Sequence, residues 1–368
     1  MLIYFIFLFV LAIIHLWMFA RTTNGNEIVL NKKYNKYFWI CVIALTLLMG
    51  LRATTVGRDM SSYYDRYENY TYMLQALRYR SEFGFNYFNY CLNKLGVSWQ
   101  LYLVITSAII STTVLLFFKR YTRRIYFSLF LFMTIGSFTM AMSGLRQTLA
   151  VCFCLISFML IETETYKGKK WKSIFIAVLF WLLAISFHNS AVVFAIYFIL
   201  RIVKIRLSKK SIILGIVIAA LSLVYGRYIL SIVNILVPQR YADVSLFDSY
   251  AINPLIILIA ILISAFCVSF TKVDHDGKYS WTMTVLFLFS LLNIFFTCLS
   301  VYQNQLGRLV YYFSNANVVL ISKAIDDTSR SNKMIIVPVL GVMCLVFFYL
   351  GASGGTLQID NYLFFWQA

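Results

Sequence analysis

Long apolar runs recur along this chain from its first residue almost to its last, separated by short connections that are rich in Lys and Arg. A helix needs about 20 apolar residues to cross the ~30 Å hydrocarbon layer, and it satisfies its own backbone polar groups there. Hydrophobic residues make up 61% of the 368, and charged residues only 12%. We therefore predict an all-α integral membrane protein whose residues 1–368 form a single transmembrane domain.

The hydropathy pattern predicts a polytopic bundle of about 12 helices. They are expected near residues 1–20, 36–51, 99–118, 125–140, 145–161, 172–187, 190–204, 211–225, 254–271, 281–300, 306–322 and 334–350. The first run lacks a basic start and is interpreted as a retained helix rather than a cleaved signal. Seven cysteines without a CxxC pair indicate neither a disulfide framework nor a zinc site.

Basic residues alternate between two sets of connections, which predicts the orientation. One set holds 22 Lys and Arg and the other 10, so the positive-inside rule makes the first set cytoplasmic and turns both ends of the chain outward. The smaller set consists of Arg52, Arg58, Arg66, Arg78, Arg80, Lys94, Arg146, Arg227, Arg240 and Arg308. The formal charge of +18 is read as orientation and contact with anionic lipid, since no nucleic-acid module is visible.

The two sets also differ in residue type. The cytoplasmic set has 15 Lys and 7 Arg, whereas the external set has one Lys and nine Arg. Arginine stays charged when it is desolvated, and it binds carboxylate or phosphate through two parallel hydrogen bonds. This pattern favours an external site for an anionic ligand. Pairing with the few external acids, or contact with lipid headgroups, is the structural alternative.

Two external segments, residues 52–98 and 226–253, are longer than turns and are expected to be partly helical. Both mix Tyr and Phe with Arg and amides, and Ile229–Val237 has the character of a segment in the membrane interface. Most of these aromatics are expected to form an interfacial belt. Stacking against sugar rings is the alternative.

The stretch SGLRQTLAVCF places Arg146 and Gln147 in the first turn of a predicted helix at the external face. A cation at this end opposes the helix dipole, so it is a poor choice for stability. A bound anion would resolve this conflict, because both Arg146 and the free backbone N–H groups would donate hydrogen bonds to it. We predict that these two residues bind an anionic part of the substrate.

Two further motifs carry polar side chains at external turns. FHNSAVV places His188 between two helices, where it can act as a base or contact substrate, or cap a helix end. In YQNQLGRLVYYFSNAN, Arg308 is predicted to start a helix, with Tyr311 and Tyr312 on the same broad face. A polar face in a membrane helix contacts protein or a water-filled cavity, and helix–helix hydrogen bonding is the structural alternative.

The stretch GLRATTVGRDMSSYYDRY contains a possible base. Asp59 is either a general base toward a sugar hydroxyl or the partner that orders Arg52 and Arg58. No carboxylate or His/Cys cluster indicates a metal site, and we expect no metal and no cofactor. The segment TKVDHDGKYS is interpreted as a solvated cytoplasmic loop.

Taken together and in order, these motifs resemble the EpsG-like branch of the Wzy-type polysaccharide polymerases. The resemblance lies in GLRATTVGRDMSSYYDRY, EFGFNYFNYCLNKLGVSW, GLRQTLA, AISFHNSA and GRLVYYF, which span roughly residues 40–320. Met60 departs from the tyrosine that is usual in the family.

The resemblance implies a membrane glycosyltransferase of the bacterial inner membrane with a GT-C-like architecture, making O-antigen, capsule or exopolysaccharide. It would join oligosaccharide repeat units carried on undecaprenyl pyrophosphate at the periplasmic or outer face, with a chain-length regulator and a flippase as further partners. We expect Arg146 and Arg308 to bind the donor pyrophosphate, which stabilises the departing charge. Arg52 and Arg58 would assist or hold the acceptor, and His188 or Asp59 would be the base.

Three rival functions fit the composition. A lipid-linked oligosaccharide flippase or anion exporter would be expected to show internal repeats and midplane polar residues, but here the charge gathers at one face and no repeat is visible. A glycan ligase would have nearly the same site chemistry, so only the motif resemblance separates it from a polymerase. A structural scaffold would not explain the preference for external Arg.

Overall fold

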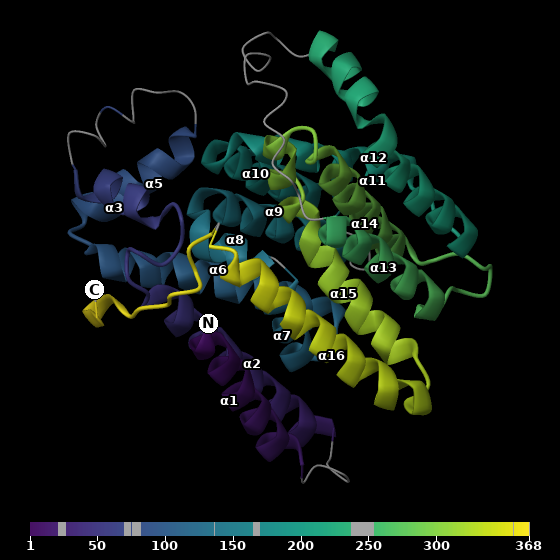
Figure 1. Ribbon diagram of the computed structural model, residues 1–368, viewed down its shortest axis with the longest axis horizontal. Coiled ribbons are helices and arrows are strands. Elements are labelled where there is room, and N and C mark those ends of the chain that lie inside the picture. The colour runs from purple at the N-terminus through teal and green to yellow at the C-terminus, as the bar shows by residue number, and fades with distance from the viewer. Residues whose placement is uncertain are drawn as a thin grey trace. The chain divides into compact units, whose positions relative to one another are not determined.

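The computed structural model describes residues 1–20, 27–69, 75, 82–135, 137–164, 170–236, 254–355 and 357–367. Helices dominate these residues, and none of them lies in a β-strand beyond two isolated bridges. Contacts between Cα atoms divide the chain into two compact units (Figure 1). Unit 1 contains Met1–Val192 and Val339–Ala368, and unit 2 contains Val193–Pro338. The predicted single membrane domain stays a prediction.

Unit 1 carries the N-terminal helices and the end of the last one. Its helices are α1 (Leu2–Phe19), α2 (Glu27–Gly50), α3 (Met60–Glu68), α5 (Phe83–Lys94), α6 (Trp99–Tyr121), α7 (Ile125–Thr134), α8 (Ser137–Ser143), α9 (Leu145–Glu164), α10 (Lys170–Phe187) and the part of α16 (Arg330–Ser353) that follows Pro338. The short 3-10 helix η1 (Asn189–Phe194) runs across the boundary between the units.

The core of unit 1 is built by α2, α6, α9 and α10, which pack in the order α2 on α6, α6 on α9 and α9 on α10. The N-terminus of α6 is capped by Ser98, whose side chain accepts a hydrogen bond from the backbone N–H of Leu101. Tyr4 of α1 forms edge-to-face contacts with Phe138 of α8 and Phe348 of α16. These contacts hold the first and last helices of the chain to one unit.

Unit 2 contains α11 (Ala195–Val203), α12 (Lys209–Leu236), α13 (Pro254–Phe270), α14 (Trp281–Leu299), the 3-10 helix η3 (Asn304–Arg308), α15 (Tyr311–Asp327) and the start of α16. Its packing joins α12 to α14, α14 to α15 and α13 to α15. Ser264 of α13 and Ser290 of α14 share a buried hydrogen bond of 2.6 Å, which satisfies two hydroxyls inside this bundle.

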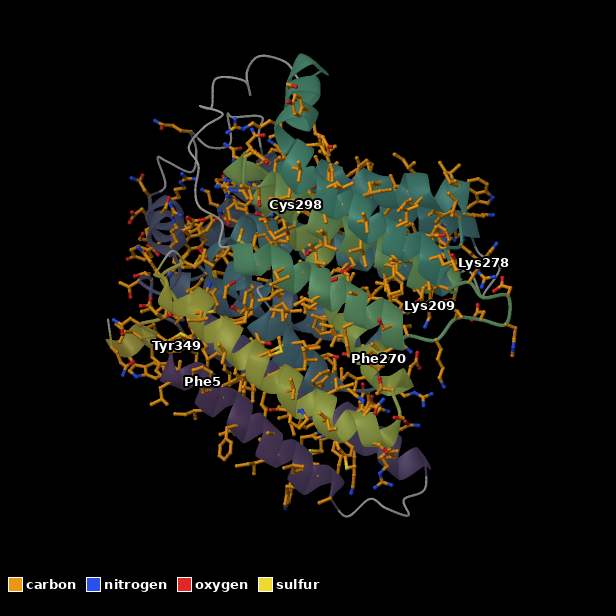
Figure 2. All side chains as sticks on the ribbon, turned by 45° about the vertical axis from the view of Figure 1, so that its right-hand side comes forward. Phe5, Lys209, Phe270, Lys278, Cys298 and Tyr349 are labelled. Atoms are coloured by element: carbon orange, nitrogen blue, oxygen red, sulfur yellow. The ribbon has the colours of Figure 1, made fainter. Side chains whose placement is uncertain are left out.

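The segment TKVDHDGKYS is a loop whose residues 274–278 are exposed, as predicted, and ion pairs hold it. Arg206 binds Asp276 at 2.8 Å and Asp274 at 2.6 Å, and its Nε donates to the carbonyl of Tyr279. An isolated bridge between Ser208 and Lys278 adds a backbone link. Figure 2 shows Lys209 and Lys278 near one another at this end of unit 2. The aspartates therefore fix the loop to the start of α12, because one guanidinium can serve both carboxylates.

Helices occupy all twelve predicted positions, but they differ in length. Among the described residues, six are long and apolar enough to span a membrane: α1, α6, α9, α12, α14 and α16. Shorter apolar helices occur in α10, in η1 with α11, and in α13. The described residues are thus all-helical, with several helices that could each cross a membrane. The count of about 12 spans and the GT-C-like architecture stay predictions.

Three predicted helices differ from the helices found. The helix expected at residues 125–140 is two helices, α7 and α8, bent by 65°. The helix expected at 190–204 begins with the six-residue η1. The helix expected at 211–225 continues as α12 to Leu236, and the interfacial character of Ile229–Val237 stays a prediction. The residues that follow position 225 are compatible with a helix, so α12 continues through them. Residues 237–253 lie outside the described residues.

Candidate active site around Arg146, Glu82 and His188

Arg146 is the second residue of α9, so its predicted place in the first turn of a helix is confirmed. Its Nη1 donates to Oε2 of Glu82, and its Nε donates to the Tyr63 hydroxyl at 3.3 Å. The guanidinium carbon lies 5.6 Å from the centre of the Tyr63 ring. The side chain keeps 30% of its surface exposed. Arg146 is therefore held on one side and open on another.

Glu82 joins this arginine to the predicted histidine. While its Oε2 accepts from Arg146, its Oε1 contacts Nδ1 of His188. Both Glu82 and His188 have only 13% of their side-chain surface exposed. Three groups that are far apart in the sequence thus meet in unit 1: the residue before α5, the first turn of α9 and the residue after α10.

The carboxylate fixes the imidazole of His188. An Nδ1 that faces a carboxylate carries the proton, which leaves Nε2 as the nitrogen that can accept one. The same arrangement orients the ring. His188 can therefore act as a general base through Nε2.

Glu82 stays ionised at neutral pH. Burial raises the pKa of its carboxyl, but the hydrogen bond from His188 and the charge of Arg146 outweigh burial and lower the pKa below its ordinary value of 4.5. Burial raises the pKa of Tyr63, so its hydroxyl is neutral and accepts the Arg146 hydrogen bond. The site therefore contains one fixed anion, one fixed cation and one titratable imidazole.

Close packing of α5 on α10 brings Glu82 to His188. A Cβ on Gly84 would lie 2.1 Å from the Ser186 hydroxyl oxygen, a distance that real Cβ atoms do not show. The two helices can approach this closely only because residue 84 has no side chain. In Figure 1, α3 and α5 lie together in unit 1.

An aromatic cluster lines this region. The Tyr63 ring contacts Phe85, which contacts Phe187. Trp99 stacks on Tyr102 with ring centres 5.2 Å apart. Rigid rings of this kind hold α3, α5 and α6 in place and exclude water from the buried side of the ion pair.

A family model described as the EpsG family matches residues 35–364. The chain belongs to the EpsG family. This is a Wzy-like polysaccharide polymerase family, so the chain is a multi-pass membrane protein of the glycosyltransferase-like polymerase kind, with lipid-linked sugars as substrates. No curated protein matches, and no solved structure matches.

The EpsG-family chain buries Arg52 completely, with 0% of the residue exposed. Its guanidinium donates to the Met49 carbonyl and contacts the Met60 sulfur at 3.1 Å. Burial lowers the pKa of Arg52 to about 10, so it remains charged at neutral pH. The predicted pairing with Asp59 is therefore not the arrangement found, and the predicted substrate contact of Arg52 stays a prediction.

The backbone around Arg52 is bound to the C-terminal segment, residues 357–367. Arg52 forms an isolated bridge with Phe364, and the N–H of Arg58 donates to the Leu357 carbonyl at 2.9 Å. The N-terminal ammonium of Met1 contacts the Asp360 carbonyl. Figure 1 shows the yellow C-terminal segment reaching the purple start of the chain. Both chain ends thus support the loop that leads to α3.

Arg58 and Asp59 lie exposed just before α3. Asp59 is the N-cap of α3 without a side-chain cap hydrogen bond. No ion pair between these two residues occurs in the described part of unit 1. Both side chains face outward, where a substrate can reach them, and their predicted roles stay predictions.

The other predicted residues lie in two places. Gln147 is buried, next to Arg146 on α9. Arg308, Tyr311 and Tyr312 belong to unit 2. The prediction that Arg308 starts a helix was wrong: it ends the 3-10 turn η3, and α15 begins at Tyr311. The N–H of Leu306 donates to the Gln303 carbonyl and that of Leu309 to the Leu306 carbonyl, and these i→i+3 bonds hold the stretch in a 3-10 turn. Arg308 is exposed and Tyr312 is buried.

Glu82 and Tyr63 were not assigned a role from the sequence. Both lie within quoted motifs, but an isolated Glu next to aromatics gives no hint of a partner 64 residues away. Scarcity is the signal that could have found Glu82, since the chain has only 14 acidic residues and 32 basic ones. The described residues contain no group of three or more His, Cys, Asp or Glu that could hold a metal ion.

Proposed function

We propose that this EpsG-family polymerase joins oligosaccharide repeat units carried on undecaprenyl pyrophosphate, at the periplasmic or outer face of the bacterial inner membrane. The growing chain leaves its lipid pyrophosphate and passes to a hydroxyl of the next lipid-linked unit. The observation that carries this proposal is the contact of one carboxylate, Glu82, with both a cation, Arg146, and a base, His188. Transfer from a pyrophosphate needs both kinds of group.

Arg146 serves the leaving group. Charge develops on the pyrophosphate as the sugar departs, and a fixed guanidinium stabilises that charge more in the transition state than in the ground state. The exposed part of Arg146 and the N–H groups in the first turn of α9 provide donors in one place. Gln147, Arg58 and the aromatics of α3 and α5 contact the sugars or the acceptor in this proposal.

His188 serves the acceptor. Its Nε2 takes the proton from the attacking hydroxyl, because Nδ1 is held by Glu82. Asp59 is the alternative base, since it is exposed in the same unit. The pyrophosphate role of Arg308, Tyr311 and Tyr312 stays a prediction from the sequence. We propose a chain-length regulator and a flippase as its partner proteins.

Reconstitution tests the proposed function. Purified protein in bilayers is supplied with lipid-linked repeat units, and products are separated on a gel. The proposal predicts a ladder of lengthening lipid-linked chains from wild type. A single addition to a different acceptor would indicate a ligase, and no product would contradict a polymerase. Product made without added divalent cation, in the presence of a chelator, would support arginine-based stabilisation of the leaving group.

A further inference from the structure

Glu82 divides its two carboxylate oxygens between groups that the proposed reaction uses at different moments. We propose that Glu82 is a positioning residue that couples donor binding to base activation: it holds Arg146 before the donor binds, and the donor pyrophosphate then displaces it from Arg146 onto His188 alone. This inference rests on the proposed function, and it adds an order of events, with the donor binding first.

The position of Glu82 is specialised. Its φ of 56° lies in the left-handed region, which is unfavourable for a residue that carries a side chain. It is also the N-cap of α5, yet its side chain makes no cap hydrogen bond. A serine or aspartate that capped α5 would be the locally favourable choice. Local stability is given up so that the carboxylate reaches Arg146 and His188, which is typical of functional positions.

Competition between anions follows from the geometry. The carboxylate occupies one Nη of the Arg146 guanidinium, and 30% of the surface of the Arg146 side chain is exposed. A pyrophosphate is a stronger ligand for arginine than a carboxylate, because it brings more charge and more acceptor oxygens. It also repels a carboxylate on the same guanidinium. Donor binding therefore favours release of Glu82 from Arg146.

Release toward His188 strengthens the base. Among the described residues, the charged and titratable groups that face this carboxylate and its partners are Arg146 on α9, Tyr63 on α3, Tyr102 on α6, His188 after α10 and, beside Tyr63, Asp59. Arg146 is the cation that neutralises Glu82 before the donor binds. A carboxylate no longer shared with that cation stabilises an imidazolium more strongly. His188 thus becomes a better proton acceptor when the donor is in place.

The transfer step then balances. The acceptor oxygen forms a bond to the anomeric carbon of the donor, and the bond from that carbon to the pyrophosphate oxygen breaks. Its electron pair leaves with the pyrophosphate, which Arg146 binds. The acceptor proton passes to Nε2 of His188 and then to solvent. When the lipid pyrophosphate departs, Glu82 returns to Arg146.

Binding of inorganic pyrophosphate tests the competition. Calorimetric titrations compare wild type with Glu82→Gln and with Glu68→Gln, an exposed acid at the end of α3, as the matched control. The proposal predicts that Glu82→Gln binds inorganic pyrophosphate about tenfold more tightly, a change of about 1.4 kcal/mol. The control should bind as wild type does. Weaker binding by Glu82→Gln would overturn the competition, because it would make Glu82 only a support for Arg146.

Steady-state polymerisation tests the coupling. An amide at position 82 offers a donor to Nδ1, which favours the wrong tautomer of His188. We expect Glu82→Gln to lower kcat about 100-fold and to shift the acid limb of its pH profile to lower pH. Glu82→Asp keeps the charge, so it should keep the wild-type pH profile at a reduced rate. A Glu82→Gln enzyme with the kcat and pH profile of the control would overturn the proposal.

The two proposals fail differently. Wild type that makes no ladder would contradict the polymerase proposal, and the coupling with it. Tighter binding of pyrophosphate by Glu82→Gln than by the control would in that case still show that Glu82 competes for Arg146. If wild type makes the ladder and Glu82→Gln matches the control in binding and rate, only the coupling is overturned.

Discussion

At the scale of single residues, burial separates the arginines that are predicted to be external into two kinds. Arg146 keeps part of its surface exposed and contacts a carboxylate, whereas Arg52 is fully buried against Met49 and Met60. The preference for external Arg therefore has more than one physical cause. One arginine is placed to meet a ligand, and the other satisfies the carbonyl at the end of α2 and stays charged in a buried setting.

This difference predicts the effect of replacing Arg52. Lysine cannot make the same set of contacts from a buried position, so Arg52→Lys is expected to lower the melting temperature by several degrees. Its affinity for inorganic pyrophosphate should equal that of wild type. Thermal unfolding and calorimetry on the same sample check both parts. A loss of pyrophosphate affinity with an unchanged melting temperature would show instead that Arg52 contacts the substrate.

The ionisation of Glu82 predicts a pH dependence. Because its pKa in the folded protein is lowered from 4.5, Glu82 stabilises the fold above the unfolded pKa, and the contribution is lost as pH falls through the folded pKa. The difference in melting temperature between wild type and Glu82→Gln should therefore be present at pH 7 and shrink below about pH 4.5. A difference in melting temperature that grows as the pH falls would contradict the lowered pKa of Glu82.

At the scale of helices, the site depends on how closely α5 approaches α10. Gly84→Ala adds a methyl group where the Ser186 hydroxyl lies 2.1 Å away, so the helices must separate and Glu82 must move from His188. Polymerisation is expected to fall about 100-fold, as is typical of a displacement near 1 Å. The measurement is the initial rate of the ladder reaction.

Two variants control that prediction. Gly341→Ala, on α16, meets nothing within 4 Å and should leave the rate unchanged. The double variant Gly84→Ala/Ser186→Gly removes the clash and should recover much of the lost rate. If Gly84→Ala retains full activity, close approach of these helices is not needed for catalysis.

At the scale of the whole molecule, the sequence predicted the class and the positions of the helices well. Apolar runs locate α1, α6 and α14 because a membrane helix must satisfy its backbone within one segment. The break between α7 and α8 was missed, since hydropathy is blind to a bend. Arg146 was singled out because it opposes the dipole of its helix, and His188 because an imidazole can act as a base near pH 7. Glu82 was not, because its contacts cross the fold.

The orientation of the molecule is a separate prediction. The basic residues place the segment 52–98, which includes Glu82, outside the cell. Leu95 is exposed at the end of α5. A reporter enzyme that is active only outside the cytoplasm should therefore be active when it is fused after Leu95. A second reporter after Lys209 should report the cytoplasm. Exchange of these two results would put Arg146 and His188 on the cytoplasmic side and contradict the proposed place of polymerisation.

The central claim is that Arg146 binds the pyrophosphate of the lipid-linked donor, and the ladder assay with Arg146→Lys tests it most directly. Lysine keeps the charge but loses the planar pair of donors, so we expect the polymerisation rate to fall about 10- to 100-fold. Arg66→Lys, an exposed arginine on α3 with no assigned role, should match wild type. A full ladder from Arg146→Lys at the wild-type rate would contradict the account.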